Sequence, residues 1–287
     1  MLIGKIGGIR IRINLLVLLL GGLYAYLGLA VEILLILAAV LIHEMAHLIM
    51  ARLLGIRVAE IDLLPFGGQA KMEDYTGLDP EQDIYLALSG PAASLSAAAI
   101  FYFLQEQIAS PYLPMFININ LYLGLFNLCP GLPMDGGHIL RAVLSKFIGY
   151  KRATSRTAAL GKLIALGLIA WGGYQLYYLQ SIGMNFIVVG ALLLWAAHRE
   201  GRLLAYAFMR YLVNKKSELS KHGLLPAQQI VSREDTLIKV LLESARPNSY
   251  MVVWAMDDSD NMMGVRSEAE LIECFLDKGP KARLRDC

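Results

Sequence analysis

Charge is scarce in this sequence. Only 17% of its 287 residues are Asp, Glu, Lys or Arg, and 56% are hydrophobic, whereas soluble domains carry about 25% charged residues. The 26 basic and 24 acidic residues nearly cancel, to a net charge of +2, so nucleic acid is not indicated as a partner. This composition argues against an ordinary soluble protein, and a mean hydropathy of +0.52 predicts several membrane crossings.

Cysteine is also rare. The three cysteines form no C-x-x-C pair, so neither a disulfide framework nor a thiolate metal site is expected. Cys129 lies in an apolar stretch, where we expect it to be a small core residue. Cys274 and Cys287 fall in a polar tail and suggest a reducing compartment.

Long apolar runs fill the first two thirds of the chain. The N-terminal run lacks a clear small-x-small cleavage site, so residues 1–30 are interpreted as an anchor and not as a signal peptide. The fourth run is interrupted by a proline- and glycine-rich segment at 130–137, and broken backbone at membrane depth indicates a site. The six predicted spans are about 13–30, 31–54, 84–104, 115–147, 158–179 and 183–198.

Basic residues alternate between successive loops. The loops near 28–32, 105–114 and 179–183 contain no Lys or Arg. Because Lys and Arg accumulate on the cytoplasmic side, the pattern places both termini in the cytoplasm and supports an even number of spans. The residues assigned to that side are Lys5, Arg10, Arg12, Arg52, Arg57, Lys71, Lys146, Lys151, Arg152, Arg156, Arg199, Arg202 and Arg210.

Three segments differ from the spans. Residues 56–74 read as a strand hairpin around Pro65-Phe66-Gly67-Gly68, or as a simple connector. Residues 200–222 mix basic and apolar side chains, typical of a helix on the inner membrane surface or of a linker helix. The tail, 223–287, reads as helix, strand, turn, strand and helix, with Ser267 capping the last helix, and this order resembles half of a CBS-domain pair.

The fold class is therefore a polytopic α-helical membrane protein with six transmembrane spans and a small α/β CBS-like cytoplasmic C-terminal domain. The expected divisions are a membrane domain at 1–199, an amphipathic linker at 200–222 and the tail at 223–287.

A histidine pair marks the second span. His43-Glu44-Met45-Ala46-His47 has the H-E-x-x-H form, which places both imidazoles on one helical face where they can hold one metal ion. Glu44 is suited to take a proton from water on that metal. Ionisable groups are costly inside a bilayer and usually mark function, so we interpret the motif as a zinc hydrolase site within the membrane.

A third ligand is needed, because catalytic zinc commonly takes three from the protein. Asp135 is the candidate, since a carboxylate in this apolar region is otherwise explained only as a helix cap. His43 precedes Arg52 by nine residues and Asp135 precedes Lys146 by eleven, which puts both roughly 13–17 Å inward from those charges. The two can therefore meet at one depth. His138, three residues after Asp135, is a weaker candidate for the same site.

These motifs resemble the site-2 protease family of intramembrane zinc metalloproteases. The resemblance covers about residues 1–200 and includes Asn127, Pro133-Met134-Asp135-Gly136, Leu64-Pro65-Phe66-Gly67-Gly68 and Ser89-Gly90-Pro91. The span count and small tail are most similar to the stage IV sporulation FB branch. The segment Cys129-Pro130-Gly131-Leu132-Pro133 departs from the plainer Asn-Pro-Asp-Gly order that is frequent in the family.

The resemblance implies a protease with one Zn²⁺ held by His43, His47 and Asp135, with Glu44 as the base. Asn127 is expected either to donate to the developing oxyanion or only to hydrogen-bond the broken helix. The implied substrate is a membrane-associated protein, most directly the pro-sequence of a sporulation sigma factor, at a bacterial cytoplasmic-type membrane or the one surrounding the forespore.

Further partners and rival functions stay open. Membrane lipid, inhibitory membrane proteins, a second copy of the chain, and ATP at the tail are the other candidate partners. A membrane zinc transporter or sensor is one rival reading, and a nucleotide-sensing regulator with an inactive protease core is another. Glu44 argues against transport, because a transport site gains nothing from a glutamate that does not bind the metal.

Overall fold

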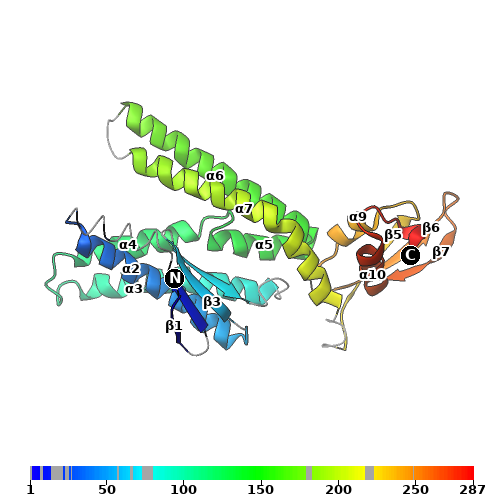
Figure 1. Cartoon of the computed structure of the whole chain (residues 1–287), viewed down its shortest axis with the longest axis horizontal. Helices are drawn as coiled ribbons and strands as arrows, with labels where there is room; N and C mark the ends of the chain where they lie inside the picture. The colour runs from blue at the N-terminus through cyan, green and yellow to red at the C-terminus, as the bar shows by residue number, and fades with distance from the viewer. Residues whose placement is uncertain are drawn as a thin grey trace. The chain divides into compact units, whose positions relative to one another are not determined.

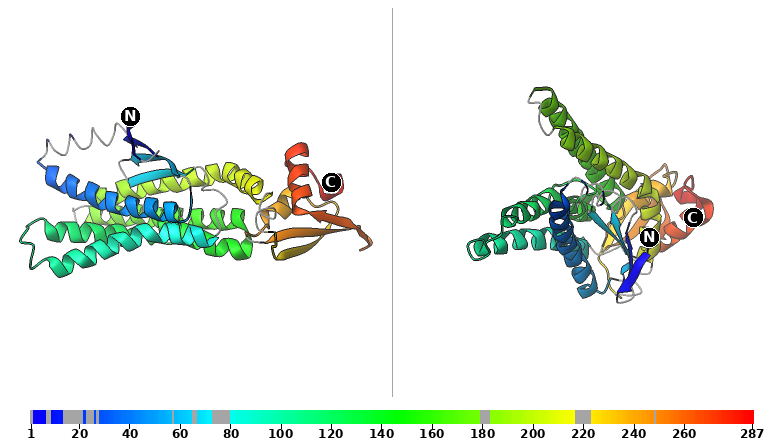
Figure 2. Two further views of the ribbon diagram at one scale, coloured as in Figure 1. Left: turned by 90° about the horizontal axis from the view of Figure 1, so that it is seen from below. Right: turned by 60° about the vertical axis from the view of Figure 1, so that its left-hand side comes forward.

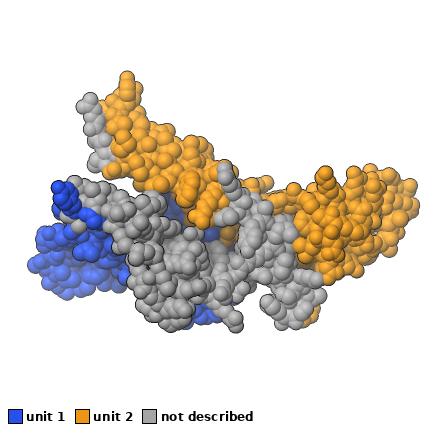
Figure 3. Space-filling model, viewed as in Figure 1, with its two compact units in different colours: residues 1–75, 82–129, 134–139 blue, residues 76–81, 130–133, 140–287 orange. Residues whose placement is uncertain are grey.

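The computed structural model shows two compact units (Figure 3). The first contains residues 1–75, 82–129 and 134–139, and the second contains 76–81, 130–133 and 140–287. Each is described by itself. The described residues are 2–6, 9–13, 22, 26, 28–56, 58–64, 67–72, 80–178, 183–216, 223–247 and 249–287.

The first unit combines a small sheet with three helices (Figures 1 and 2). The strand order is β1-β2-β3-β4, with β2 and β3 parallel and the other two pairs antiparallel. Helix α2 lies between β2 and β3 in the chain and contacts both β3 and β4. The elements are β1 (Leu2–Ile6), β2 (Ile9–Ile13), α2 (Ala30–Leu53), β3 (Val58–Leu64), β4 (Gly67–Met72), α3 (Pro80–Leu104) and α4 (Leu113–Asn127).

The hairpin expected within 56–74 is confirmed, as β3 and β4 pair in register from Leu64↔Gly67 to Val58↔Met72. The strands β1 and β2 were missed. Ile9-Arg10-Ile11-Arg12-Ile13 alternates apolar and basic residues, which is the strand period, but its arginines were used only to assign topology. Most of the first predicted span, 13–30, lies outside the described residues.

The fourth predicted span is broken into two helices. Helix α4 ends at Asn127 and α5 (Asp135–Ile148) starts after seven residues, so the predicted interruption is confirmed. Leu132, within the break, is fully buried and its N–H donates to the Thr157 carbonyl at 3.1 Å. That bond holds the segment between α4 and α5 against α6 (Tyr150–Tyr178).

Helices α6 and α7 (Gly183–Lys216) pack side by side along their length (Figure 1). Helix α7 runs through both the sixth predicted span and most of the segment expected as a separate surface helix, so no break separates them at 199. Arg, Leu, Ala and Met favour helix on either side of that boundary, and a change in polarity alone does not end a helix.

Three described helices are long and apolar enough to cross a membrane, namely α2, α3 and α6. They correspond to the second, third and fifth predicted spans. The fourth span is divided into two helices of 15 and 14 residues. A helical membrane protein is therefore supported, whereas the count of six spans stays a prediction.

The tail is a three-stranded sheet with two helices, in the order β5-β6-β7. Its core consists of apolar side chains from α9, β6 and α10, and Ser267 caps α10 in a capping box with Glu270. The Ser267 N–H bonds the Glu270 carboxylate and keeps the pKa of Glu270 below its usual value. The elements are β5 (Ala227–Arg233), α9 (Ile238–Glu243), β6 (Tyr250–Met256), β7 (Met262–Ser267), α10 (Glu268–Lys278) and the 3-10 turn η1 (Leu284–Asp286).

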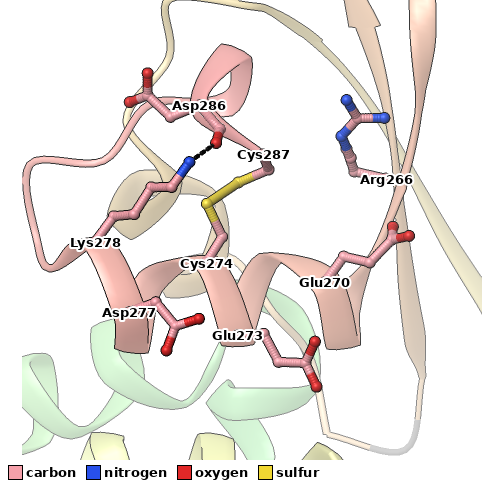
Figure 4. Close-up of a pocket in the computed structure, with 8 residues that line it drawn as sticks. All are labelled: Arg266, Glu270, Glu273, Cys274, Asp277, Lys278, Asp286 and Cys287. Carbon is pink, nitrogen blue, oxygen red and sulfur yellow. Dashed lines mark hydrogen bonds between the residues drawn. A yellow bond between two sulfur atoms is a disulfide. The ribbon is translucent and has the colours of Figure 1, made fainter.

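The predicted tail order is confirmed from α9 to α10, but β5 was missed. The expectation of unpaired tail cysteines was wrong, because Cys274 on α10 and Cys287 after η1 form a disulfide (Figure 4). Their separation of 13 residues gave no sign that η1 returns to α10. Cys129 is half-buried and not a core residue.

The tail is attached to the start of α6 by specific contacts within the second unit. Lys151 pairs with Glu243 of α9, and Tyr150 packs against the tail core. Gly149 has φ +83° and its backbone lies so close to α9 that a Cβ there would be 2.7 Å from the Glu243 carbonyl oxygen. The joint between α5 and α6 is therefore also the docking point of the tail.

Candidate metal centre

The three predicted ligands meet in the first unit. His43 and His47 lie one turn apart on α2, and Asp135 is the first residue of α5. The Nε2 atoms of the two histidines are 3.2 Å apart, and Asp135 Oδ2 is 3.1 Å from His43 Nε2 and 3.3 Å from His47 Nε2. These three residues form the one group of converging metal ligands among the described part of the chain.

The spacing fits a zinc ion. Ligand atoms at 2.0–2.1 Å from a tetrahedral centre are separated by about 3.3 Å, close to the three distances observed. The donor set of two imidazoles and one carboxylate is a zinc set that leaves a fourth position for water. The side chains are largely buried, with 5%, 12% and 17% of their surface exposed for His43, His47 and Asp135.

Groups of helix α3 contact the Nδ1 atoms of both imidazoles and orient the two rings. His47 Nδ1 donates to the Leu86 carbonyl at 2.8 Å, and Ser89 Oγ is 3.2 Å from the same nitrogen. His43 Nδ1 lies 3.0 Å from Ser94 Oγ. Because a carbonyl only accepts, the proton of His47 is on Nδ1 and the lone pair of Nε2 faces the other ligands.

Gly90 lies directly over the ligand atoms. A Cβ at this position would be 2.3 Å from His47 Nε2 and 2.7 Å from His43 Nε2. Any side chain at position 90 would occupy the space in front of the two histidine nitrogens. Gly90 therefore keeps the centre open on the α3 side.

Gly136 permits the turn that delivers Asp135. A Cβ here would be 2.2 Å from the Leu128 carbonyl oxygen, so the first turn of α5 lies against the end of α4. At this helix N-terminus the Asp135 carboxylate is favoured by the unpaired N–H groups. Asp135 is thus the first residue of α5, and its carboxylate converges with the two histidine nitrogens, as the prediction of a third ligand requires.

The remaining predicted residues are placed differently. Glu44 is half-buried on α2 and its carboxylate interacts electrostatically with His47. Asn127, the last residue of α4, donates through Nδ2 to the Leu123 carbonyl at 3.0 Å, which is the helix-bonding alternative. His138 is not one of the three converging ligands.

Sequence reasoning missed the residues that surround the ligands. Ser89 and Gly90 were noted only as part of the family resemblance, and Leu86 and Ser94 were not singled out. A signal was present, because Leu86, Gly90 and Ser94 are spaced by four and share one face of α3.

The chain is similar to several known proteins. The family model of Peptidase family M50 matches residues 31–111 and 105–170. A zinc metalloprotease of Methanocaldococcus jannaschii is 33% identical over 179 residues, which are 61% of this chain and 50% of that protein. The chain thus spans about half the length of this curated relative.

The chain matches two further proteins over most of their length. Stage IV sporulation protein FB of Bacillus subtilis is 25% identical over 258 residues, 88% of this chain and 86% of that protein. The solved site-2 protease from Methanocaldococcus jannaschii is 32% identical, with a TM-score of 0.57 over 70% of this chain and 94% of that one. With His43, His47 and Asp135 converging as described, the chain belongs to the site-2 protease family of zinc metalloproteases, peptidase family M50.

Proposed function

We propose that this chain is an intramembrane zinc protease that cleaves a membrane-associated protein. The observation that carries the proposal is the triangle of His43 Nε2, His47 Nε2 and Asp135 Oδ2, with edges of 3.1–3.3 Å. The two histidines lie on α2, a helix apolar enough to span a bilayer. Zinc bound there supplies a Lewis acid that lowers the pKa of water toward ~7 and polarises a carbonyl.

Glu44 acts as the general base. It takes the proton of the attacking water on its carboxylate and later passes the proton to the leaving amine. Its place beside His43, and its electrostatic contact with His47, keep it next to the ligands without making it one of them. This position supports hydrolysis over the rival zinc transporter or sensor, in which such a glutamate has no task.

Asn127 is proposed as a donor to the oxyanion. Its amide nitrogen now bonds the Leu123 carbonyl within its own helix, so it has to turn away from that bond to reach the substrate. The bond itself supports the competing view, in which Asn127 only holds the end of α4. An Asn127→Ala variant with wild-type zinc content and much slower cleavage would favour the oxyanion role.

The substrate proposed is the pro-sequence of a sporulation sigma factor. The support is the 25% identity to stage IV sporulation protein FB, which extends over 88% of this chain. A helical substrate hides its carbonyls in its own hydrogen bonds and has to unwind before cleavage. Strand β4 is an edge of the four-strand sheet and contacts α2, so we propose that the unwound segment adds to this edge.

The topology proposed has both termini in the cytoplasm, six spans, and a site in a bacterial cytoplasmic-type membrane such as the one surrounding the forespore. The alternation of basic loops supports it. Inhibitory membrane proteins and a second copy of the chain are further candidate partners.

The tail is proposed to be CBS-like and to present the substrate to the membrane domain. Its β-α-β-β-α order supports the first part, and its attachment to the start of α6 through Lys151 and Glu243 supports the second. ATP is poorly supported, because the tail hollow of about 370 Å³ is lined by four carboxylates and two basic groups (Figure 4). Its lining residues are Arg266, Glu270, Glu273, Cys274, Asp277, Lys278, Asp286 and Cys287.

Purified protein in liposomes with a membrane-tethered sigma-factor precursor tests the function. Chelation should stop cleavage and added zinc should restore it. Asp135→Asn should lower zinc content and cleavage together, because it weakens the one anionic ligand. Asp258→Asn, in an exposed tail turn, is the matched control and should change neither. Full zinc and full activity in Asp135→Asn would mean that another residue completes the site, with His138 the first to test.

A further inference from the structure

A hollow of about 430 Å³ lies between α6 and α7, apart from the metal centre. Its lining is apolar along one side and basic at one end. Ile169 of α6 and Ala191, Leu194 and Trp195 of α7 supply the apolar part. Lys162 of α6 and His198 of α7 supply the other end.

The basic end marks the limit of the apolar part of the hairpin. From Leu163 to Tyr178, and from Gly183 to Ala197, the two helices carry no charged residue over 16 and 15 positions. At 1.5 Å per residue these stretches are about 22–24 Å long, shorter than the roughly 30 Å hydrocarbon core of a bilayer. Lys162 and His198 therefore lie at or just inside the edge of the hydrocarbon region, where lipid phosphates are within reach.

A second cation lies near the same end. The Arg199 guanidinium lies over the ring of Trp195, 5.9 Å from its centroid, and Trp195 lines the hollow. Glu200, two residues beyond His198, leaves the helix about 200° further round. Among the described residues, no carboxylate lines the hollow. The charge at this end is thus positive, and the walls below it are apolar.

We propose that this hollow binds an anionic phospholipid. The phosphate would lie among Lys162, His198 and Arg199, and an acyl chain would lie along Ile169, Leu194 and Trp195. Cationic groups above an apolar wall complement a lipid that is anionic at one end and aliphatic below it. On the topology proposed above, this end faces the cytoplasmic leaflet, where anionic lipids attract basic residues. Snorkelling cations without a bound lipid are the alternative.

Quenching of Trp195 fluorescence tests the site. The full chain carries three tryptophans, so Trp171→Phe and Trp254→Phe leave Trp195 as the reporter. In symmetric vesicles, brominated phosphatidylglycerol should compete for the site about tenfold better than brominated phosphatidylcholine. Lys162→Gln with Arg199→Gln should abolish that preference while quenching by phosphatidylcholine and the zinc content stay unchanged.

A second reporter separates a site from general attraction to a charged bilayer. With Trp195→Phe and Trp254→Phe, the remaining Trp171, which lies on α6 and is 52% exposed, should show no lipid preference. Equal preference at Trp195 and Trp171 would mean that charge acts on the whole protein and would overturn the proposal. Equal quenching of Trp195 by both lipids, or a preference that survives loss of both cations, would overturn it as well.

Discussion

Helix α2 exposes several of its leucines and buries His43, whereas the leucines of the tail core are buried. On α2, Leu34 and Leu41 are 64% and 54% exposed while His43 is 4% exposed. In the tail, Leu242 and Leu271 are fully buried. The environment therefore decides where a leucine lies. In lipid, exposing a leucine costs nothing, whereas exposing a polar histidine is costly, so the histidine is buried.

The difference shows what positions the zinc ligands. In the tail, the apolar core holds the elements together. Around the metal centre, polar side chains and close backbone contacts hold the elements, through Leu86, Ser89, Ser94 and Gly90 of α3. Such packing suits helices in lipid, where burial of apolar surface does not drive association.

The largest effect on zinc affinity should come from adding one methyl group at the metal centre. Gly90→Ala places a Cβ 2.3 Å from His47 Nε2, so the imidazole has to move. We expect zinc affinity to fall about 10–100-fold, the usual cost of disturbing ligand orientation. Zinc titration of purified protein measures it.

Gly167→Ala is the control, because a Cβ at this position in α6 meets nothing within 4 Å. It should bind zinc as the wild type does. Equal zinc affinity in both variants would show that α3 does not lie over the ligands as described.

Replacing an exposed leucine with lysine should have different effects on α2, which faces lipid, and on the tail, which faces water. Leu41→Lys, on α2, should cost about 3 kcal/mol of insertion free energy, since lysine at membrane depth is disfavoured. Leu224→Lys, in the tail and 86% exposed, should change stability by less than about 0.5 kcal/mol. The inserted fraction and the thermal unfolding midpoint of both variants measure the contrast. Equal tolerance at both sites would argue that α2 faces water.

The smallest effect concerns the cap of α10. Ser267→Ala removes the hydroxyl that accepts from the Glu270 N–H and should lower tail stability by about 1 kcal/mol without altering zinc binding. Denaturant unfolding of the full chain, followed through Trp254 in β6, measures it. Ser259→Ala, in the exposed 257–261 turn, is the control. A loss of zinc in Ser267→Ala would contradict the independence of the two regions.

The ligand set was predictable because each ligand left a trace in the sequence. His43 and His47 were spaced by one helical turn, and Asp135 was a charge at a matching depth in a broken span. The break and the Ser267 cap were predictable for similar reasons, as proline, glycine and capping residues act locally.

The rest depended on contacts between distant segments. The bond from His47 to the Leu86 carbonyl involves the backbone, which carries no residue-specific signal. The Cys274–Cys287 disulfide needs η1 to return to α10. Strands β1 and β2 are short and amphipathic, and β2 pairs with β3 across more than 40 residues, which periodicity cannot show.

The central claim is that Glu44 is a base and not a ligand. A single preparation of the Glu44→Gln variant, assayed both for bound zinc and for cleavage of the membrane-tethered substrate, tests it most directly. The account predicts wild-type zinc content with cleavage reduced about 10²–10⁴-fold, the usual contribution of a general base. Cleavage at the wild-type rate by the zinc-loaded variant would contradict the hydrolytic mechanism.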